Sequence, residues 1–266
     1  MGGRFDSTNV LQKPIAVIPS ISIDHTNFLG DTIEKISWHK AGILKDKGKL
    51  VIGPMNRNAK QIFLQEAREK NVSVIDYNKH FFVQNNTYTY GEIQFENLYP
   101  SMFGLHQQSN MALAITALIE GGFQLLDNKV QVAVKQASLA GRMERVGKNI
   151  YMDGAHNRAS IDALVETIQQ YFKDKRVHFI IGILKDKDYV YMLRKLEEVG
   201  SSFEFVNFQH ERALQASELY KHCLHSEKRV TKEIEHIEFI ENSKTDVTII
   251  TGSLYFLSEI ITKTGK

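Results

Sequence analysis

The sequence predicts an α/β protein, because short apolar segments rich in isoleucine and valine alternate with amphipathic segments along most of its 266 residues. Near the amino terminus the predicted strands cover residues 14–23, 49–55 and 72–78. Predicted helices over residues 31–44 and 58–71 lie between them, the first with Asp31 or Thr32 as its N-cap. This strand–helix–strand order indicates a parallel sheet.

A different pattern follows over residues 80–104, which alternate between polar and aromatic side chains. Two turn signals interrupt the alternation, the pair Asn85-Asn86 and Gly91, so we expect antiparallel hairpins here. Residues 108–122 and 128–139 then have the spacing of two helices, and the first ends at a pair of glycines.

A second α/β series starts after a boundary near residues 140–149. Its predicted strands lie within residues 149–157, which include a turn, 177–184, 202–208 and 247–255, which run into the final helix. Predicted helices over residues 159–172, 189–200 and 216–226 separate them, and a last helix ends the chain. Repeated alternation of this kind predicts a doubly wound, Rossmann-like domain.

Composition sets limits on the class of protein. The chain is 42% hydrophobic and 24% charged, as globular domains are, and its net charge of +2 comes from 33 basic and 31 acidic residues that are well interspersed. We therefore expect neither a nucleic acid nor a membrane as partner. The single cysteine, Cys223, excludes an internal disulfide, and the first residues have no secretory pattern, so we expect a cytoplasmic protein.

Polar residues follow three of the predicted strands. They are the groups Asp24-His25-Thr26, Asp153-Gly154-Ala155-His156-Asn157 and Thr251-Gly252-Ser253. Each group has an ordinary structural interpretation, because aspartate, asparagine and serine cap helices and form turns. The carboxyl ends of parallel strands also meet at one edge of a sheet, where ligands bind. Lys40 lies near the carboxyl end of a predicted helix and also has a structural interpretation, because a positive charge there interacts favourably with the helix dipole.

An ordered set of motifs resembles folylpolyglutamate synthase, often also a dihydrofolate synthase, of the Mur ligase superfamily. The motifs are GGRFDSTN from residue 2, SISIDHTNFLGDTIEKISWHKAGILK from residue 20, GLHQQSNMALAITAL, GRMERV, DGAHNRAS, IGILKDKD and TGSLYFLSE. The resemblance covers essentially the whole chain. It implies ATP-dependent addition of L-glutamate to a folate or dihydropteroate carboxylate through an acyl phosphate, with Mg²⁺ and ATP.

The resemblance also implies a domain scheme. Residues 1–140 would be the remnant of a P-loop-type ATPase domain with a mixed sheet, 141–147 a hinge, and 148–266 a Rossmann-like glutamate-ligase domain. His25 and Lys40 would be the metal pair, with Lys40 carbamylated so that it offers oxygen ligands, which Mg²⁺ prefers. Asp6 would lie near the reacting centre.

Further site residues come from the same resemblance. Asn110, Arg142 and Asp153 would contact the nucleotide. His156 and Ser253 would form the pocket for the incoming glutamate. Arg158 stands where the family usually has proline, so the turn after His156 departs from the pattern.

The phosphate-binding motif G-x-x-x-x-G-K-[ST] is not found in the sequence. We therefore expect this chain alone to be inactive. The strands of its first domain would lack sheet neighbours, and an exposed sheet edge favours association, so we also expect this chain to self-associate where the complete enzyme would be a monomer. Two alternatives stay open at this point. One is another Mur-type amino-acid ligase, and the other is a non-catalytic remnant that binds a nucleotide, a folate or a partner chain.

Overall fold

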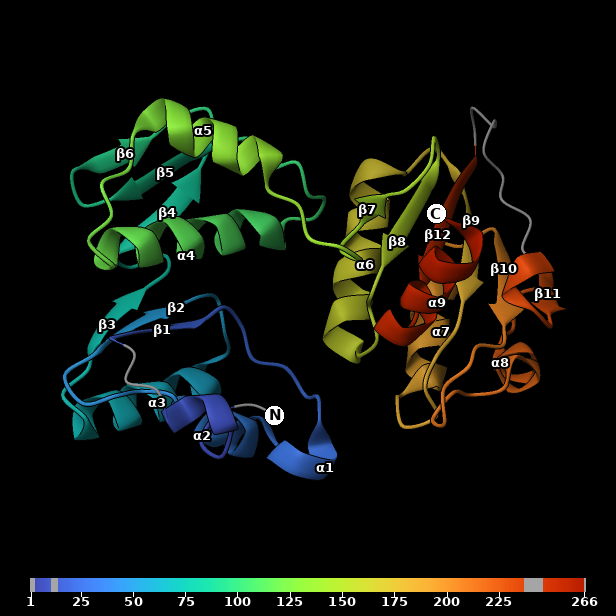
Figure 1. The fold of residues 1–266 in the computed structure, drawn as a ribbon, viewed down its shortest axis with the longest axis horizontal. Coiled ribbons are helices and arrows are strands. Elements are labelled where there is room, and N and C mark those ends of the chain that lie inside the picture. Colours follow the sequence, from blue (N-terminus) through green and yellow to red (C-terminus); the bar gives the residue numbers. More distant parts are fainter. Residues whose placement is uncertain (1–2, 11–13, 237–245, 266) are drawn as a thin grey trace. The chain divides into compact units, whose positions relative to one another are not determined.

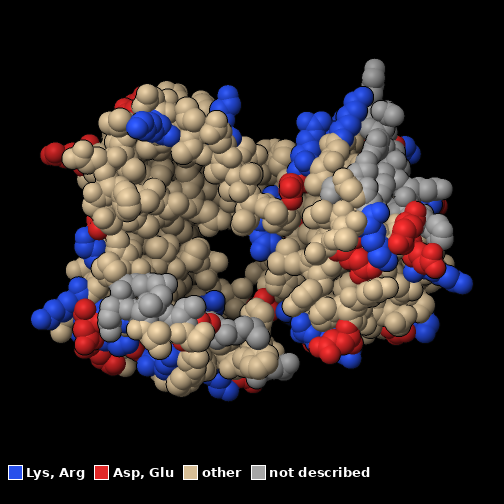
Figure 2. Space-filling model, viewed as in Figure 1, with Lys and Arg blue, Asp and Glu red and all other residues tan. Residues whose placement is uncertain are grey.

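The computed structural model describes residues 3–10, 14–236 and 246–265. It divides into two compact units (Figure 1). Unit 1 comprises Met1–Ser101 and Leu105–Ala137, and unit 2 comprises Met102–Gly104 and Ser138–Lys266. On the face drawn in Figure 2, basic and acidic side chains are mixed on each unit, as the interspersed sequence predicts.

Unit 1 begins with an alternating α/β segment. Its elements are η1 (Ser7–Val10), β1 (Ile15–Ile18), α1 (Thr26–Leu29), α2 (Ile33–Ala41), β2 (Lys49–Ile52), α3 (Arg57–Glu69) and β3 (Ser73–Asp76). The strands form a parallel sheet in the order β1-β2-β3. Thr32 caps α2 by accepting a hydrogen bond from the Lys35 amide at 3.2 Å, which confirms one of the two predicted caps. Strand β1 is shorter than predicted, because Pro19 directly after it has no N–H to donate to a ladder.

The rest of unit 1 contains the predicted hairpins and two helices. These elements are β4 (Phe81–Gln84), β5 (Thr87–Tyr90), β6 (Ile93–Phe95), α4 (His106–Glu120) and α5 (Asp127–Gln136). Asn85, Asn86 and Gly91 have positive φ angles of 50°, 58° and 59°, as tight hairpin turns require. Buried residues of α4, among them Leu113, belong to the core that Val51 of β2 and Phe81 of β4 share. Helix α4 therefore packs against both sheets.

Unit 2 contains one sheet with helices on both faces. Its elements are β7 (Glu144–Arg145), β8 (Ile150–Asp153), α6 (Arg158–Tyr171), β9 (Arg176–Ile181), α7 (Tyr189–Glu197), β10 (Ser202–Val206), α8 (Ala216–His222), β11 (Lys228–Thr231), η2 (Ile234–His236), β12 (Asp246–Thr251) and α9 (Leu254–Thr264). The order is β11-β10-β9-β12-β8-β7, and each neighbouring pair is parallel except β7 with β8. The predicted α/β class is confirmed.

Alternation along the strands creates the two faces of this sheet. Tyr151 and Phe179 belong to the core formed with α6, α7 and α8, whereas their neighbours Met152 and Ile180 belong to the core formed with Phe256 of α9. Strands β8 and β9 are thus apolar on both sides, as in a doubly wound fold.

Two short strands of unit 2 were not predicted. Strand β11 is an edge strand with the polar sequence KRVT, so it has no apolar run to reveal it. Strand β7 lies inside the stretch 141–147, for which a hinge was predicted, and it pairs with β8. No helix within the described residues is long and apolar enough to cross a membrane.

Candidate functional site

The carboxyl edge of the unit 2 sheet collects two of the three predicted polar strand ends. Strands β8 and β12 are adjacent, and Thr251 lies opposite Asp153 in their register. Thr251 also lies opposite Ile181 of β9 on its other side. The segments that carry His156 and Ser253 therefore leave the sheet from neighbouring strands, as the sequence predicted for the ends of one parallel sheet.

Asp153 joins the turn after β8 to the chain before β7. Its Oδ2 accepts a hydrogen bond from the Met143 amide, and its Oδ1 accepts one from the Ala155 amide, both at 2.9 Å. Burial raises the pKa of Asp153, although the two amides and the charges of Arg142 and His156 act in the opposite direction. Both carboxylate oxygens thus hold backbone groups, so this aspartate organises the turn.

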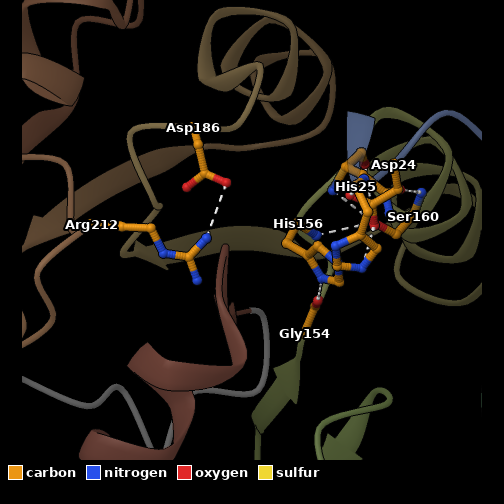
Figure 3. A network of polar contacts seen from close by, with 8 residues as sticks. Asp24, His25, Gly154, His156, Ser160, Asp186 and Arg212 are labelled. Atoms are coloured by element: carbon orange, nitrogen blue, oxygen red, sulfur yellow. Dashed lines mark hydrogen bonds and ion pairs between the residues drawn. The ribbon is translucent and has the colours of Figure 1, made fainter. Parts of the chain in front are cut away.

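His156 has its imidazole oriented by its own turn. Its Nδ1 lies 2.7 Å from the carbonyl oxygen of Gly154 (Figure 3). A carbonyl only accepts, so Nδ1 carries a proton, and in the neutral ring Nε2 is the acceptor. The amides of His156 and Asn157 both donate to the Ser160 hydroxyl at 3.0 Å. The Asn157 side chain completes a capping box with Ser160 at the start of α6.

Ser253 is the N-cap of α9 and is almost fully buried. Its hydroxyl accepts a hydrogen bond from the Tyr255 amide at 3.2 Å. The preceding Gly252 has a φ of +115°, and a Cβ there would lie 2.5 Å from the Gly182 carbonyl oxygen. Only glycine allows the chain to pass this close to the Gly182 carbonyl oxygen. This passage places Ser253 at the carboxyl edge of the sheet.

The two other predicted nucleotide contacts lie in different units. Arg142 precedes β7 in unit 2 and is half-buried, with its Nη1 3.3 Å from the Gly141 carbonyl oxygen. Asn110 is exposed in α4 of unit 1, and its amide donates to the Gln107 side chain at 3.2 Å.

In unit 1, His25 is the N-cap residue of α1 and has left-handed backbone angles, φ 53° and ψ 38°. A non-glycine residue in this region costs free energy, and such residues concentrate at functional sites. Its amide donates to Asp24 Oδ1 at 2.8 Å, and its exposed Nε2 lies 3.8 Å from Asp24 Oδ2. Asp24 thus fixes the turn that presents the imidazole.

The turn that contains Asp6 packs on the end of α2 that contains Lys40. The Arg4 amide donates to the His39 carbonyl at 2.7 Å, and the Asn9 side chain donates to the Gly42 carbonyl at 3.0 Å. Asp6 and Lys40 are both half-buried. The structure therefore brings together two segments, 3–9 and 39–42, that the resemblance placed at the reacting centre.

The donors available for a cation are few. Within the stretches 3–10, 14–236 and 246–265, no group of three histidine, cysteine, aspartate or glutamate side chains is arranged to hold a metal ion. His25 and a carbamylated Lys40 would supply only some of the oxygen-rich ligands that Mg²⁺ requires. They account for part of a metal site.

The sequence did not predict two ion pairs that lie near the carboxyl edge of the unit 2 sheet. Arg158 contacts Asp188 through Nε at 2.8 Å and Nη2 at 2.6 Å, and Arg212 contacts Asp186 at 3.3 Å. The only sequence signal was the charged run KDKD after a predicted strand, because the partner arginines lie far from it along the chain.

Comparison with known proteins gives a consistent result. Residues 141–254 match the family model "Mur ligase, glutamate ligase domain". The chain is 34% identical to the dihydrofolate synthase/folylpolyglutamate synthase of Bacillus subtilis, over 98% of this chain and 65% of that protein. It thus spans slightly less than two thirds of that relative.

Solved structures agree over the whole chain. Folylpolyglutamate synthase of Mycobacterium tuberculosis, solved with ADP and AMPPCP, matches with a TM-score of 0.89 at 26% identity, covering 100% of this chain and 67% of that one. A bifunctional folylpolyglutamate synthase/dihydrofolate synthase solved with Mn, AMPPNP and L-glutamate matches with a TM-score of 0.84 at 25% identity, covering 100% and 65%. The chain is therefore similar over its whole length to the dihydrofolate synthase/folylpolyglutamate synthase family, and its residues 141–254 match the glutamate ligase domain of the Mur ligases.

Proposed function

We propose that this chain takes part in ATP-dependent addition of L-glutamate to a carboxylate of dihydropteroate or folate. The observation that carries the proposal is the 34% identity to the Bacillus subtilis enzyme over 98% of the chain. In such a reaction the acceptor carboxylate attacks the γ-phosphate of ATP, which forms an acyl phosphate and releases ADP. The amine of glutamate then attacks the acyl phosphate, and phosphate leaves.

The glutamate would bind at the carboxyl edge of the unit 2 sheet. His156 offers an imidazole there that the Gly154 carbonyl orients, and this ring could form a hydrogen bond with glutamate. Ser253 places the amino terminus of α9, with its partial positive charge, at the same edge. Both groups suit a substrate that carries an amine and two carboxylates.

We propose Asn110, Arg142 and Asp153 for the nucleotide, and His25 with carbamylated Lys40 for part of the site of a divalent cation. Such a cation would neutralise charge on the phosphoryl oxygens. The strained backbone of His25 and the contact between segments 3–9 and 39–42 support this assignment.

A hybrid enzyme tests the proposal. In it, this chain replaces the matching segment of the Bacillus subtilis relative, which supplies the remaining part of that protein. We expect an ATP-dependent product that is heavier than the acceptor by one glutamyl residue, detected by mass spectrometry. A folded hybrid that makes no such product, beside an active unaltered relative, would argue for a non-catalytic role.

The 266-residue chain should be assayed in parallel. We expect it to make no glutamylated product alone, because its sequence has no glycine-rich phosphate motif and loss of such preorganised contacts costs several kcal/mol in the barrier. Turnover by the chain, free of host enzyme, would refute that expectation.

A further inference from the structure

We propose that Arg212 is a specificity-determining residue that binds one carboxylate of the incoming L-glutamate. The inference rests on the proposed function and adds a residue to its amino-acid site. Arg212 lies in the loop after β10, and Asp186 lies in the loop after β9. These strands are neighbours in the sheet, and β12, which leads to Ser253, lies on the other side of β9. The pair is therefore at the edge that carries His156 and Ser253.

The backbone around Arg212 is held by several contacts. The Lys185 amide donates to the Arg212 carbonyl at 2.8 Å, and Leu184 forms a bridge with Ala213. The Arg212 amide donates to Nδ1 of His210 at 3.1 Å, and the His210 ring packs on Tyr255 with centroids 4.2 Å apart. This loop is thus fixed both to the loop after β9 and to the start of α9, close in sequence to Ser253.

The guanidinium of Arg212 makes little use of its donors. Its contact among the described residues is through Nη1 to Asp186 Oδ2, at 3.3 Å. Arg158 and Arg176 of the same unit each use two nitrogens on one carboxylate, at 2.6–2.9 Å. The Arg212 side chain is 41% exposed, so solvent and solutes can reach it. A guanidinium has five N–H donors in a planar fork, which matches a carboxylate.

The neighbouring charges favour a carboxylate over a phosphate. Asp186 lies beside Arg212 and would repel a phosphate dianion more strongly than a carboxylate. Lys185 in the same loop as Asp186 has its Nζ 3.4 Å from the Glu211 carbonyl oxygen. A carboxylate therefore fits this charge pattern better than a phosphate does.

Binding of L-glutamate to the 266-residue chain, followed by nuclear magnetic resonance titration, tests the inference. We expect Arg212→Gln to raise the dissociation constant about tenfold or more, because a charge-assisted bidentate contact is lost. Arg212→Lys should not restore the affinity, because an ammonium cannot form the fork. The matched control is Arg176→Gln, which removes an Arg–Asp pair from the amino end of β9 and should leave binding unchanged.

Asp186→Asn separates recognition from loop support. If Arg212 contacts the substrate, this variant should bind L-glutamate at least as well as the unaltered chain. Equal weakening in Asp186→Asn and Arg212→Gln would show that the pair only supports the loop and would overturn the inference. Unchanged affinity in Arg212→Gln, or no binding of L-glutamate by the unaltered chain, would also overturn it. The hybrid enzyme judges the proposed function separately, since its turnover does not depend on this result.

Discussion

Glu204 of β10 is a buried carboxylate whose neutralisation should destabilise unit 2. The residue is 0% exposed. Its Oε2 accepts a hydrogen bond from Arg229 Nη2 at 2.7 Å and lies 3.3 Å from His178 Nε2, and its Oε1 accepts from the Thr231 hydroxyl at 2.5 Å. The three partners come from β9 and β11, so the carboxylate links three neighbouring strands at the edge of the sheet.

The cost of Glu204→Gln can be worked out from these contacts. The glutamine carbonyl can still accept from Arg229 and His178, and the Thr231 hydroxyl can rotate to accept from the new amide. The substitution removes the negative charge from the acceptor of the Arg229 hydrogen bond. We therefore expect it to lower the free energy of unfolding by about 2 kcal/mol at neutral pH. Glu204→Ala, which leaves the partners without an acceptor, should cost about 3–5 kcal/mol.

The same network predicts a pH dependence. Burial is the largest effect and raises the pKa of Glu204, but hydrogen bonds from His178, Thr231 and Arg229 outweigh it and hold the pKa below its ordinary value of 4.5. A carboxyl with a depressed folded pKa stabilises the protein above its unfolded pKa. That stabilisation is lost as the pH falls below 4.5 and passes the folded pKa. Glu204→Gln should remove this part of the acid sensitivity.

Hydrogen exchange of the β10 and β9 amides, measured by mass spectrometry, reports the free energy of opening for unit 2 itself. The control is Glu218→Gln, an exposed carboxylate with lysine and histidine partners, which should leave exchange unchanged. Equal protection in Glu204→Gln and the unaltered chain would refute the reasoning.

Three further predictions concern the site. Gly252→Ala should lower the stability of unit 2 by about 1–3 kcal/mol, because φ is +115° and the new Cβ meets a carbonyl oxygen at 2.5 Å; urea unfolding would show an unchanged midpoint if the strain is absent. In the hybrid enzyme, His156→Ala and Ser253→Ala should raise the KM for glutamate far more than the KM for ATP, and equal increases would mean that both residues only support the fold. Lys40→Arg should abolish turnover and added acetate should partly rescue Lys40→Ala, since a guanidinium cannot form a carbamate; a fully active Lys40→Arg would remove Lys40 from the metal site.

The sequence was sufficient for features that depend on local patterns. The hairpin turn at Asn85-Asn86 and a cap at Asp31 or Thr32 were predicted from residue type and position alone, and the turn and the Thr32 cap are present. The edge strand β11 was missed because an exposed, charged strand has no apolar period. Edge strands often lack an apolar pattern because they have few buried neighbours.

The candidate site shows the same division. That His156 and Ser253 lie at one sheet edge could be predicted, because both follow strands of one parallel series. The pairing of Arg212 with Asp186 depends on which loops lie side by side, and strand order alone decides that. Likewise, the sequence predicted that Asp153 would contact the nucleotide. It did not predict that Asp153 accepts hydrogen bonds from two backbone amides, because one of them depends on the course of the chain before β7.

The central claim is that this chain serves a ligase that activates an acceptor carboxylate as an acyl phosphate. The most direct test supplies the hybrid enzyme with dihydropteroate whose carboxylate carries a heavy-oxygen label, together with ATP and L-glutamate. Attack of that carboxylate on ATP, followed by attack of the glutamate amine, transfers one labelled oxygen to phosphate for each amide bond formed. We predict labelled phosphate in equal amount to the glutamylated product. Glutamylated product accompanied by unlabelled phosphate would contradict the account.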